Sequence, residues 1–305
     1  VRKDTANTLQ GINTYLFNES GSYMGLTQAT DASGIVRFNV SQGSYKVRTD
    51  YMGYQFWSDT VQVTAATSID LTIPHHSVSI TVNSACQGTT SPLSGITVYL
   101  FSPSNAYLGL SQTTGSDGHV NFSLPDKDYK VRADYLGRQY FSPVFNAQDT
   151  VVNIPTADAE ITVIQGGQAI GGVNVYVFTP SGAYLGIAGV TDASGKVTFR
   201  LPAASYTFRV DYLGNQYWSS EESLVADQIK PITTNTGGGS FTLTVLKGES
   251  DPLIGAKCYA FSAAGSYLGL SGTTGSNGQV SYSLADGSYK FRIDYLGSQF
   301  WTDFV

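Results

Sequence analysis

The stretch that decides the fold is Tyr289-Lys-Phe-Arg-Ile-Asp-Tyr-Leu-Gly297, followed by Ser-Gln-Phe-Trp301, because the chain contains it four times. The other copies read YKVRTDYMGYQFW, YKVRADYLGRQYF and YTFRVDYLGNQYW and begin at Tyr45, Tyr129 and Tyr206. A long period of this kind indicates a tandem array of similar units, so it outweighs the length of the chain as a guide to domain number.

Within each copy, apolar and charged residues alternate. Tyr289, Phe291 and Ile293 point one way, and Arg292 and Asp294 point the other, which predicts a β-strand with one face on a core. The recurring Arg-x-Asp has two readings. It is either a solvated face with an ion pair worth under about 1 kcal/mol, or a charge ladder that docks a neighbouring repeat or subunit. The candidate ladder consists of Arg48, Asp50, Arg132, Asp134, Arg209, Asp211, Arg292 and Asp294.

The repeat predicts four small domains, and short strands separated by turn signals make them all-β, two-sheet sandwiches in an elongated array. The expected segments are 1–76, 77–156, 157–236 and 237–305. Repeat 1 is expected to contain strands over Val36–Val40 and Ile69–Ile73. Its first strand and the last strand of repeat 4 are expected to be truncated. The chain is therefore interpreted as a window onto a longer repetitive protein, or as one whose neighbours supply the missing strands.

Aromatic residues are the candidates for function. Each repeat has a Tyr-x-Phe strand with apolar residues on both faces, and the central stretch ends in Trp or Phe. If these rings are exposed, they stack on sugars or form subunit contacts; otherwise they are ordinary sandwich core. The candidate interaction surface consists of Tyr15, Phe17, Trp57, Tyr99, Phe101, Phe141, Tyr176, Phe178, Trp218, Tyr259, Phe261 and Trp301.

The motifs of the fourth repeat resemble a known family. They are Leu243-Thr-Val-Leu-Lys-Gly-Glu, Leu253-Ile-Gly-Ala, Thr274-Gly-Ser-Asn-Gly-Gln-Val and Leu284-Ala-Asp-Gly-Ser-Tyr. This scheme is similar to that of Cna-B type and carboxypeptidase-regulatory-like (transthyretin-like) domains. The resemblance implies an Ig-like, Cna-B-like (prealbumin-like) sandwich that serves as a stalk or fibre module in bacterial surface proteins.

The composition of the chain excludes some classes of binding partner from what is expected. Charged residues make up 13% of the chain and the net charge is −6, with no run of Lys or Arg, so nucleic acid is not expected as a partner. No apolar stretch is long enough for membrane insertion. Cys86 and Cys258 are expected to be buried thiols, with a disulfide between chains as the alternative. Asn18, Asn39 and Asn121 stand in glycosylation sequons, which matter only if the host glycosylates.

No catalytic or metal-binding pattern is present, and neither enzyme activity nor a cofactor is expected. The Thr-Asp/Gly-x-x-Gly turns, such as Thr30–Gly34, offer too few carboxylates for calcium. The leading hypothesis is an extracellular or cell-surface structural or adhesive protein, a fibre, filament, surface-layer or stalk subunit that associates with itself or with neighbouring repeats, including by strand donation. The alternatives are a protein that binds glycans or another cell surface through Tyr/Trp platforms, and a non-catalytic accessory region of a large secreted enzyme.

Overall fold

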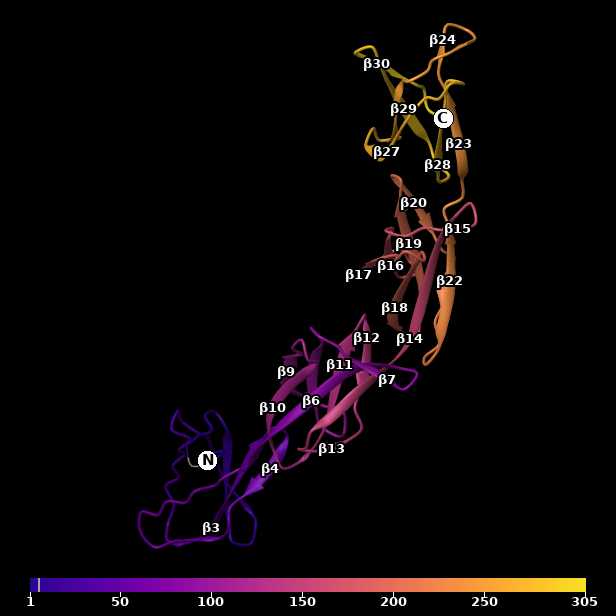
Figure 1. The fold of residues 1–305 in the computed structure, drawn as a ribbon. Helices are drawn as coiled ribbons and strands as arrows, with labels where there is room; N and C mark the ends of the chain where they lie inside the picture. Colours follow the sequence, from indigo (N-terminus) through magenta and orange to yellow (C-terminus); the bar gives the residue numbers. More distant parts are fainter. Residues whose placement is uncertain (5) are drawn as a thin grey trace. The chain divides into compact units, whose positions relative to one another are not determined.

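The computed structural model describes residues 1–4 and 6–305 and builds them from strands without a helix. The all-β prediction is confirmed. The chain divides into two compact units: unit 1 is Val1–Ser84 with Thr90–Ile154, and unit 2 is Ala85–Thr89 with Pro155–Val305 (Figure 1). Segments 1–76, 77–156, 157–236 and 237–305 are called repeats 1 to 4 below, and their boundaries remain a prediction. In the described part of the chain, no helix is long and apolar enough to span a membrane.

Repeats 1 and 2 supply the strands of unit 1. They are β1 (Asn13–Asn18), β2 (Tyr23–Ala29), β3 (Gly43–Tyr51), β4 (Tyr54–Trp57), β5 (Val61–Val63), most of β6 (His75–Cys86), most of β7 (Thr89–Pro92), β8 (Thr97–Phe101), β9 (Tyr107–Thr113), β10 (His119–Pro125), β11 (Asp128–Tyr135), β12 (Arg138–Phe141), β13 (Phe145–Asn146) and the start of β14 (Thr150–Gln165).

Repeats 3 and 4 supply nearly all the strands of unit 2, to which repeat 2 adds the end of β6 and the first residue of β7. They are the remainder of β14, β15 (Gln168–Ala169), β16 (Asn174–Phe178), β17 (Tyr184–Val190), β18 (Lys196–Pro202), β19 (Ser205–Tyr212), β20 (Asn215–Trp218), β21 (Glu222–Ser223), β22 (Ile229–Asn235), β23 (Gly239–Thr244), β24 (Leu246–Lys247), β25 (Asp251–Pro252), β26 (Lys257–Ser262), β27 (Tyr267–Thr273), β28 (Gln279–Leu284), β29 (Tyr289–Tyr295) and β30 (Ser298–Trp301).

Repeat 2 is a sandwich of two layers. One layer pairs β10 with β6, which bonds to β14, and the other has the order β12-β11-β8-β9. Alternate residues of these strands point inward, as the period of 2 predicts. Ile80 of β6, Leu100 of β8 and Val131 of β11 are all fully buried in one cluster. Since these three residues come from both layers, the cluster fills the space between them.

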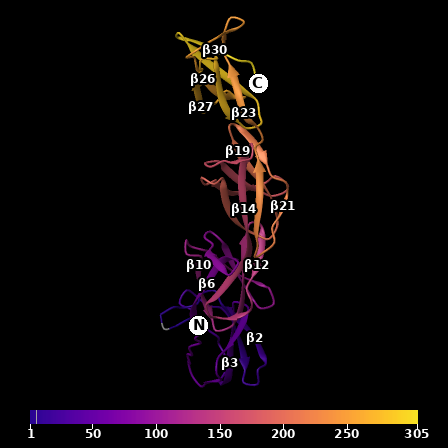
Figure 2. The same ribbon diagram turned by 45° about the vertical axis from the view of Figure 1, so that its right-hand side comes forward.

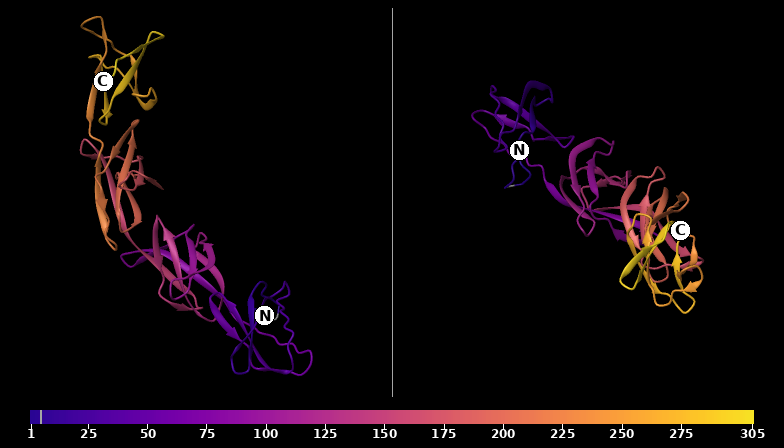
Figure 3. Two further views of the ribbon diagram at one scale, coloured as in Figure 1. Left: turned by 180° about the vertical axis from the view of Figure 1, so that it is seen from behind. Right: turned by 90° about the horizontal axis from the view of Figure 1, so that it is seen from above.

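Repeats 3 and 4 follow the same plan. In repeat 3, β14, which is labelled in Figure 2, pairs antiparallel with β18 and parallel with β22 (both labelled in Figure 1), and the second layer has the order β17-β16-β19-β20. In repeat 4, β23 pairs with β28 opposite the layer β27-β26-β29-β30, drawn in orange and yellow in Figure 3. Phe241 of β23 stacks on the fully buried Phe291 of β29, with ring centroids 5.1 Å apart.

Repeat 1 differs from the prediction in one layer. The strands expected over Val36–Val40 and Ile69–Ile73 are not formed; the latter segment makes a single parallel bridge, between Thr72 and Arg2. In repeat 3 the equivalent strands, β18 and β22, both pair with β14. Among the described residues, 36–40 have no such partner strand, and a strand without a ladder does not satisfy its backbone donors and acceptors.

Candidate interaction surface

The candidate residues are brought together by strand register. Arg48 of β3 lies opposite Tyr15 of β1 on one side and opposite Trp57 of β4 on the other. The same row is formed by Tyr99, Arg132 and Phe141, by Tyr176, Arg209 and Trp218, and by Tyr259, Arg292 and Trp301. Residues directly opposite each other on one face have Cβ atoms about 5 Å apart. Each row therefore places an arginine between two aromatic rings.

Each arginine lies over the rings beside it. The distance from the guanidinium carbon to the tyrosine centroid is 4.5 to 4.7 Å in the four copies, and 5.2 to 5.7 Å to the phenylalanine two residues after that tyrosine. A cation over an aromatic face contributes about 0.5–2 kcal/mol, and most when it is desolvated. The four arginine side chains are 20 to 25% exposed, so these contacts are only partly screened by water.

The aspartate of each Arg-x-Asp forms an ion pair with the arginine of the same motif. Arg132 Nε lies 2.8 Å from Asp134 Oδ1, and the other three pairs lie at 2.8 to 2.9 Å. Both members lie on one strand, two residues apart, and they lock the guanidinium plane against the rings. The pairs in Arg48–Asp50 and its three equivalents are thus local clamps within each repeat.

The aromatic candidates occupy two levels. Phe17, Phe101 and Phe178 are 7 to 8% exposed and form the floor. Trp57, Trp218, Trp301 and Phe141 are 43 to 51% exposed, and each lies over its phenylalanine with ring centroids 4.7 to 5.7 Å apart. These residues belong to the sheet face opposite the core residues Leu16, Leu100, Val177 and Ala260.

Four further tyrosines complete the surface and are absent from the predicted set. Each is the first residue of a Tyr-Leu/Met-Gly motif and is 48 to 49% exposed. The four residues are Tyr23, Tyr107, Tyr184 and Tyr267. A bulge between Tyr15 and Phe17 brings Tyr23 opposite Phe17, where the two ring centroids are 5.5 Å apart. The recurrence of the motif in the sequence was the signal that could have identified these tyrosines. The bulge that brings them beside the phenylalanines cannot be predicted from periodicity.

A second recurring feature is the turn at the end of the central strand. Met52 and Gly53 in repeat 1, and Leu213 and Gly214 in repeat 3, both have positive φ, as a two-residue type I′ turn requires. A residue with a Cβ in this region costs about 1–2 kcal/mol, yet all four repeats place Leu or Met there. Such strain persists where surrounding contacts maintain it.

In unit 1 those contacts come from the next repeat. Met52 and Tyr54 pack against the core of repeat 2 together with Leu108. The Tyr54 hydroxyl donates a hydrogen bond to the Asp128 carbonyl, and its ring meets Tyr129 edge-on at 5.7 Å. The turn of repeat 1 therefore docks onto the start of β9, which carries the Tyr-Leu-Gly motif, and onto the start of β11.

Unit 2 contains the same joint. Leu213 packs against the core of repeat 4 beside Leu268, the equivalent of Leu108. The Tyr217 hydroxyl donates to the Asp286 carbonyl, and Asn215 Nδ2 donates to the Tyr289 hydroxyl at 3.3 Å. The tyrosine that donates the hydroxyl hydrogen bond directly follows the turn glycine in unit 1 and lies three residues after it in unit 2. The turn thus docks at the same site in both units, although different residues make the hydrogen bond. None of these joint residues was predicted from the sequence.

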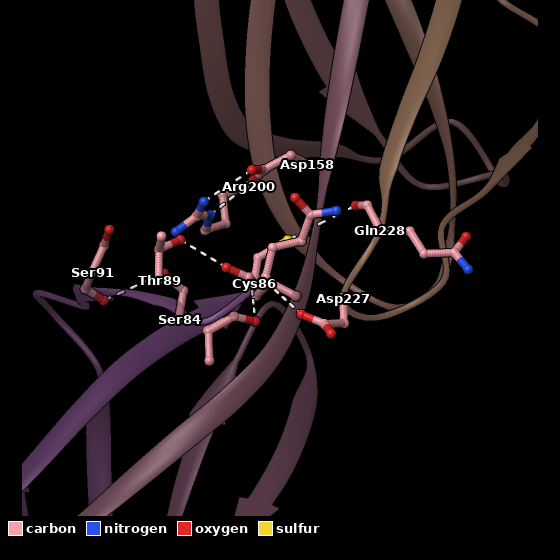
Figure 4. Close-up of polar contacts among 11 residues, drawn as sticks. Ser84, Cys86, Thr89, Ser91, Asp158, Arg200, Asp227 and Gln228 are labelled. Carbon is pink, nitrogen blue, oxygen red and sulfur yellow. Dashed lines mark hydrogen bonds and ion pairs between the residues drawn. The ribbon is translucent and has the colours of Figure 1, made fainter.

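The cysteines are free and buried. Cys86 is 1% exposed, and its thiol lies 3.9 Å from the Gln228 carbonyl in unit 2 (Figure 4). Nearby, the Gln87 backbone NH donates to Asp227, and Arg200 makes a bidentate pair with Asp158 at 2.8 and 2.9 Å. Cys258 is fully buried in the core of repeat 4.

Cys258 is expected to resist thiol reagents in the folded chain. Burial, with a smaller effect from Asp294, raises its pKa from 9.0 to about 11, and only the thiolate is reactive. In a Cys86→Ser background, labelling with an aromatic disulfide reagent is expected to be slow at neutral pH and fast in denaturant. Because the unfolded chain forms the thiolate first, stability is expected to fall as pH rises above 9.0 toward 11. Rapid stoichiometric labelling of the folded chain would contradict the buried position.

Among the described residues, no group of three or more His, Cys, Asp or Glu side chains lies close enough together to hold a metal ion. What the four copies share is a sheet face that carries aromatic rings, guanidinium groups and carboxylates. In addition, the turns of repeats 1 and 3 are docked onto the next repeat. The chemical capacity of this arrangement is contact: stacking, cation–π attraction and hydrogen bonding.

Neither a protein-family model nor a curated protein sequence matches the chain. Similar solved structures include the Bacillus anthracis TIE protein, with 17% identity and a TM-score of 0.25; the alignment covers 97% of this chain but 66%, just under two thirds, of that one. The alignment with the shaft pilin SpaA from Lactobacillus rhamnosus GG covers 53% of this chain and 97% of SpaA, with 12% identity and a TM-score of 0.28. The alignment with BcpA, the major pilin subunit of Bacillus cereus, covers 77% of this chain and 97% of BcpA, with 12% identity and a TM-score of 0.23. The fold assignment itself rests on the strand order and cores described above.

Proposed function

We propose that this chain is a non-catalytic structural or adhesive protein of the cell exterior, a subunit of a fibre, filament, surface layer or stalk. The observation that carries the proposal is the joint between consecutive repeats, which recurs in both units with the equivalent turn docked onto the start of the equivalent strand, β9 or β27. A tandem array in which each repeat contacts its neighbour gains stability from nearest-neighbour packing. Such an array lengthens by one repeat at a time, each with its own core and a contact to the repeat before it.

The aromatic rows supply the adhesive part of the proposal. Trp57, Trp218 and Trp301 are 43 to 51% exposed and each lies against a phenylalanine. Rigid aromatic rings beside an arginine are typical of the residues that dominate protein contacts. Strand donation is the proposed finer mechanism in repeat 1, where residues 36–40 carry no ladder. An extended segment of another copy would pair with them as a strand pairs with a sheet edge.

Glycan binding is the second candidate. The same half-exposed rings could stack on sugar faces, with the neighbouring Asp and Arg as hydrogen-bonding groups. The rows then act as one platform per repeat. This candidate predicts loss of sugar binding when the tryptophans are removed, whereas the structural proposal predicts loss of association between chains.

The test compares the chain with the variant Trp57→Ala/Trp218→Ala/Trp301→Ala. Sedimentation velocity over a concentration series is expected to show self-association of the chain, weakened about tenfold or more in the variant, since losing an aromatic hot spot costs about 2 kcal/mol or more. In the same samples, amide hydrogen exchange at residues 36–40 is expected to slow as concentration rises, because strand donation protects those amides.

Three results decide between the candidates. A glycan array that binds the chain but not the variant would replace the structural proposal with sugar binding. A chain that stays monomeric at every concentration and binds no sugar would remove both. Association with unchanged exchange at residues 36–40 would remove strand donation alone. The variant Tyr54→Phe, which keeps the exposed rows intact, serves as the control for effects of internal loosening.

A further inference from the structure

Strand β10 of repeat 2 has one edge to which no strand is bonded. On its other side β10 pairs with β6 over all seven of its residues, in a register without a bulge (Figure 1). No strand in the described part of the chain pairs with the open side. Repeat 2 lies between repeats 1 and 3 in the chain, and both of its layers are formed. The open edge is therefore a feature of the sandwich of repeat 2 itself.

The backbone groups along the open edge belong to alternate residues. Val82 N–H donates to the Gly118 carbonyl at 2.9 Å, so the carbonyl of the residue just before β10 points toward β6. In an antiparallel ladder the N–H and C=O groups of successive residues point to opposite sides of the strand. Those of His119, Asn121 and Ser123 therefore point to the open edge.

Two of these three residues have backbone groups that are available to another strand. The groups of His119 are bound in the preceding turn, where Asp117 accepts its N–H at 3.1 Å and Gly115 N–H donates to its carbonyl at 3.0 Å. Within residues 1–4 and 6–305, no strand or turn bonds to the backbone groups of Asn121 and Ser123 on this side. A row of unpaired N–H and C=O groups is a template for pairing with another chain.

β10 also lacks the features that prevent pairing at an edge. Charged side chains, especially Lys, and bulges keep natural edge strands apart. The sequence of β10, HVNFSLP, contains no Lys, Arg, Asp or Glu, and its proline is the last residue. The equivalent strand of repeat 3, β18, reads KVTFRLP and carries Lys196 and Arg200. Charge thus marks this edge in repeat 3 but not in repeat 2.

We propose that β10 pairs antiparallel with β10 of a second copy, about a two-fold axis that passes between the two Phe122 residues. In this register Asn121 of each copy lies opposite Ser123 of the other, and the two exchange backbone hydrogen bonds, so the available groups of both edges are all used. The occupant follows from the strand: a partner has to be extended, uncharged and alternating in polarity, and β10 of a second copy is such a strand.

This inference rests on the proposed self-association and names one contact for it. The contact is isologous, because the same edge of both copies takes part, and it closes at two chains. It is expected to be weak. Each backbone hydrogen bond contributes about 1 kcal/mol net, and a single strand pair is smaller than the surface of about 1,000 Å² that a stable interface buries. Pairing is therefore expected at high protein concentration, or where chains are held at a surface.

The test uses two double variants of the full chain, Asn121→Lys/Ser123→Lys and Asn121→Glu/Ser123→Glu. Both positions are exposed, so folding is preserved, which circular dichroism verifies. In the proposed register each variant places like charges opposite each other twice, so self-association measured by sedimentation velocity is expected to weaken about tenfold or more. An equimolar mixture of the two variants is expected to regain association, because every Lys then lies opposite a Glu.

Amide hydrogen exchange of the unmodified chain gives a second measurement. Exchange at Asn121 and Ser123 is expected to slow as concentration rises, because their N–H groups become bonded. The amides of Val120 and Phe122 point toward β6, where they lie opposite Ile80 and Val78, and their exchange is expected to be independent of concentration. These two amides are the internal reference.

Ser281→Lys/Ser283→Lys is the matched control, because these exposed residues occupy the equivalent positions in β28; it is expected to associate like the unmodified chain. Weakening in the control as well would assign the effect to net charge and overturn the proposal. A mixture that does not regain association would overturn it too. If the double variants at 121 and 123 associate normally, or those amides exchange equally at every concentration, the β10 contact is wrong while the proposed self-association stands. An unmodified chain that stays monomeric overturns both.

Discussion

Replacing Arg48 by methionine is expected to lower the free energy of unfolding of unit 1 by about 3 kcal/mol. Two losses combine. The guanidinium no longer lies over Tyr15, Phe17 and Trp57, at 4.5, 5.3 and 5.8 Å, and Asp50 keeps its charge without the partner whose Nε lies 2.9 Å away. Because the Asp50 side chain is 35% exposed, water offsets part of the second loss, and the full cost of a buried unpaired charge is not reached.

The measurement is urea unfolding followed by Trp57 fluorescence in a background with Trp218 and Trp301 replaced by phenylalanine. Arg37→Met is the matched control: its side chain is 77% exposed and lies 4.0 Å from Asp31, so a change within about 0.5 kcal/mol is expected. Adding Asp50→Asn to Arg48→Met should recover part of the loss, because the stranded charge is removed. Equal costs for Arg48→Met and Arg37→Met would show that the clamp does not stabilise the sheet.

Replacing Gly214 by alanine is expected to destabilise unit 2 by about 3 kcal/mol, against about 1 kcal/mol for Gly297→Ala. Both glycines have nearly the same φ, 78° and 80°, so the strain of placing a Cβ there is common to both. A Cβ on Gly214 would meet Ser262 Cβ at 2.7 Å, whereas one on Gly297 meets nothing within 4 Å. The difference between the two variants therefore isolates the packing of the joint.

Thermal and urea unfolding of the two variants, compared with the unmodified chain, provide the measurement. Trp218 directly follows Tyr217, whose hydroxyl takes part in the joint, and Trp301 lies in repeat 4, so their fluorescence follows both sides of the contact. Equal destabilisation by the two substitutions would mean that the turn of repeat 3 is not held against Ser262.

Much of the fold could be predicted because it depends on local pattern. The alternation in Tyr289–Tyr295 indicates a strand with one buried face, and Phe291 and Ile293 do lie in the core. The same alternation put Tyr99 opposite in direction to Val98 and Leu100, as found. The prediction of strands over 36–40 and 69–73 was wrong because pattern describes which face a segment would bury but does not supply the strand that pairs with it.

The sequence by itself determined most of the strands, the turns and the identity of the residues that recur, because periodicity and turn chemistry act over a few residues. Only the tertiary structure decided that Arg48 lies between Tyr15 and Trp57, that a bulge brings Tyr23 onto Phe17, and that the turn at Met52 is covered by repeat 2. Those arrangements depend on the pairing and packing of segments far apart along the chain, which no local pattern encodes.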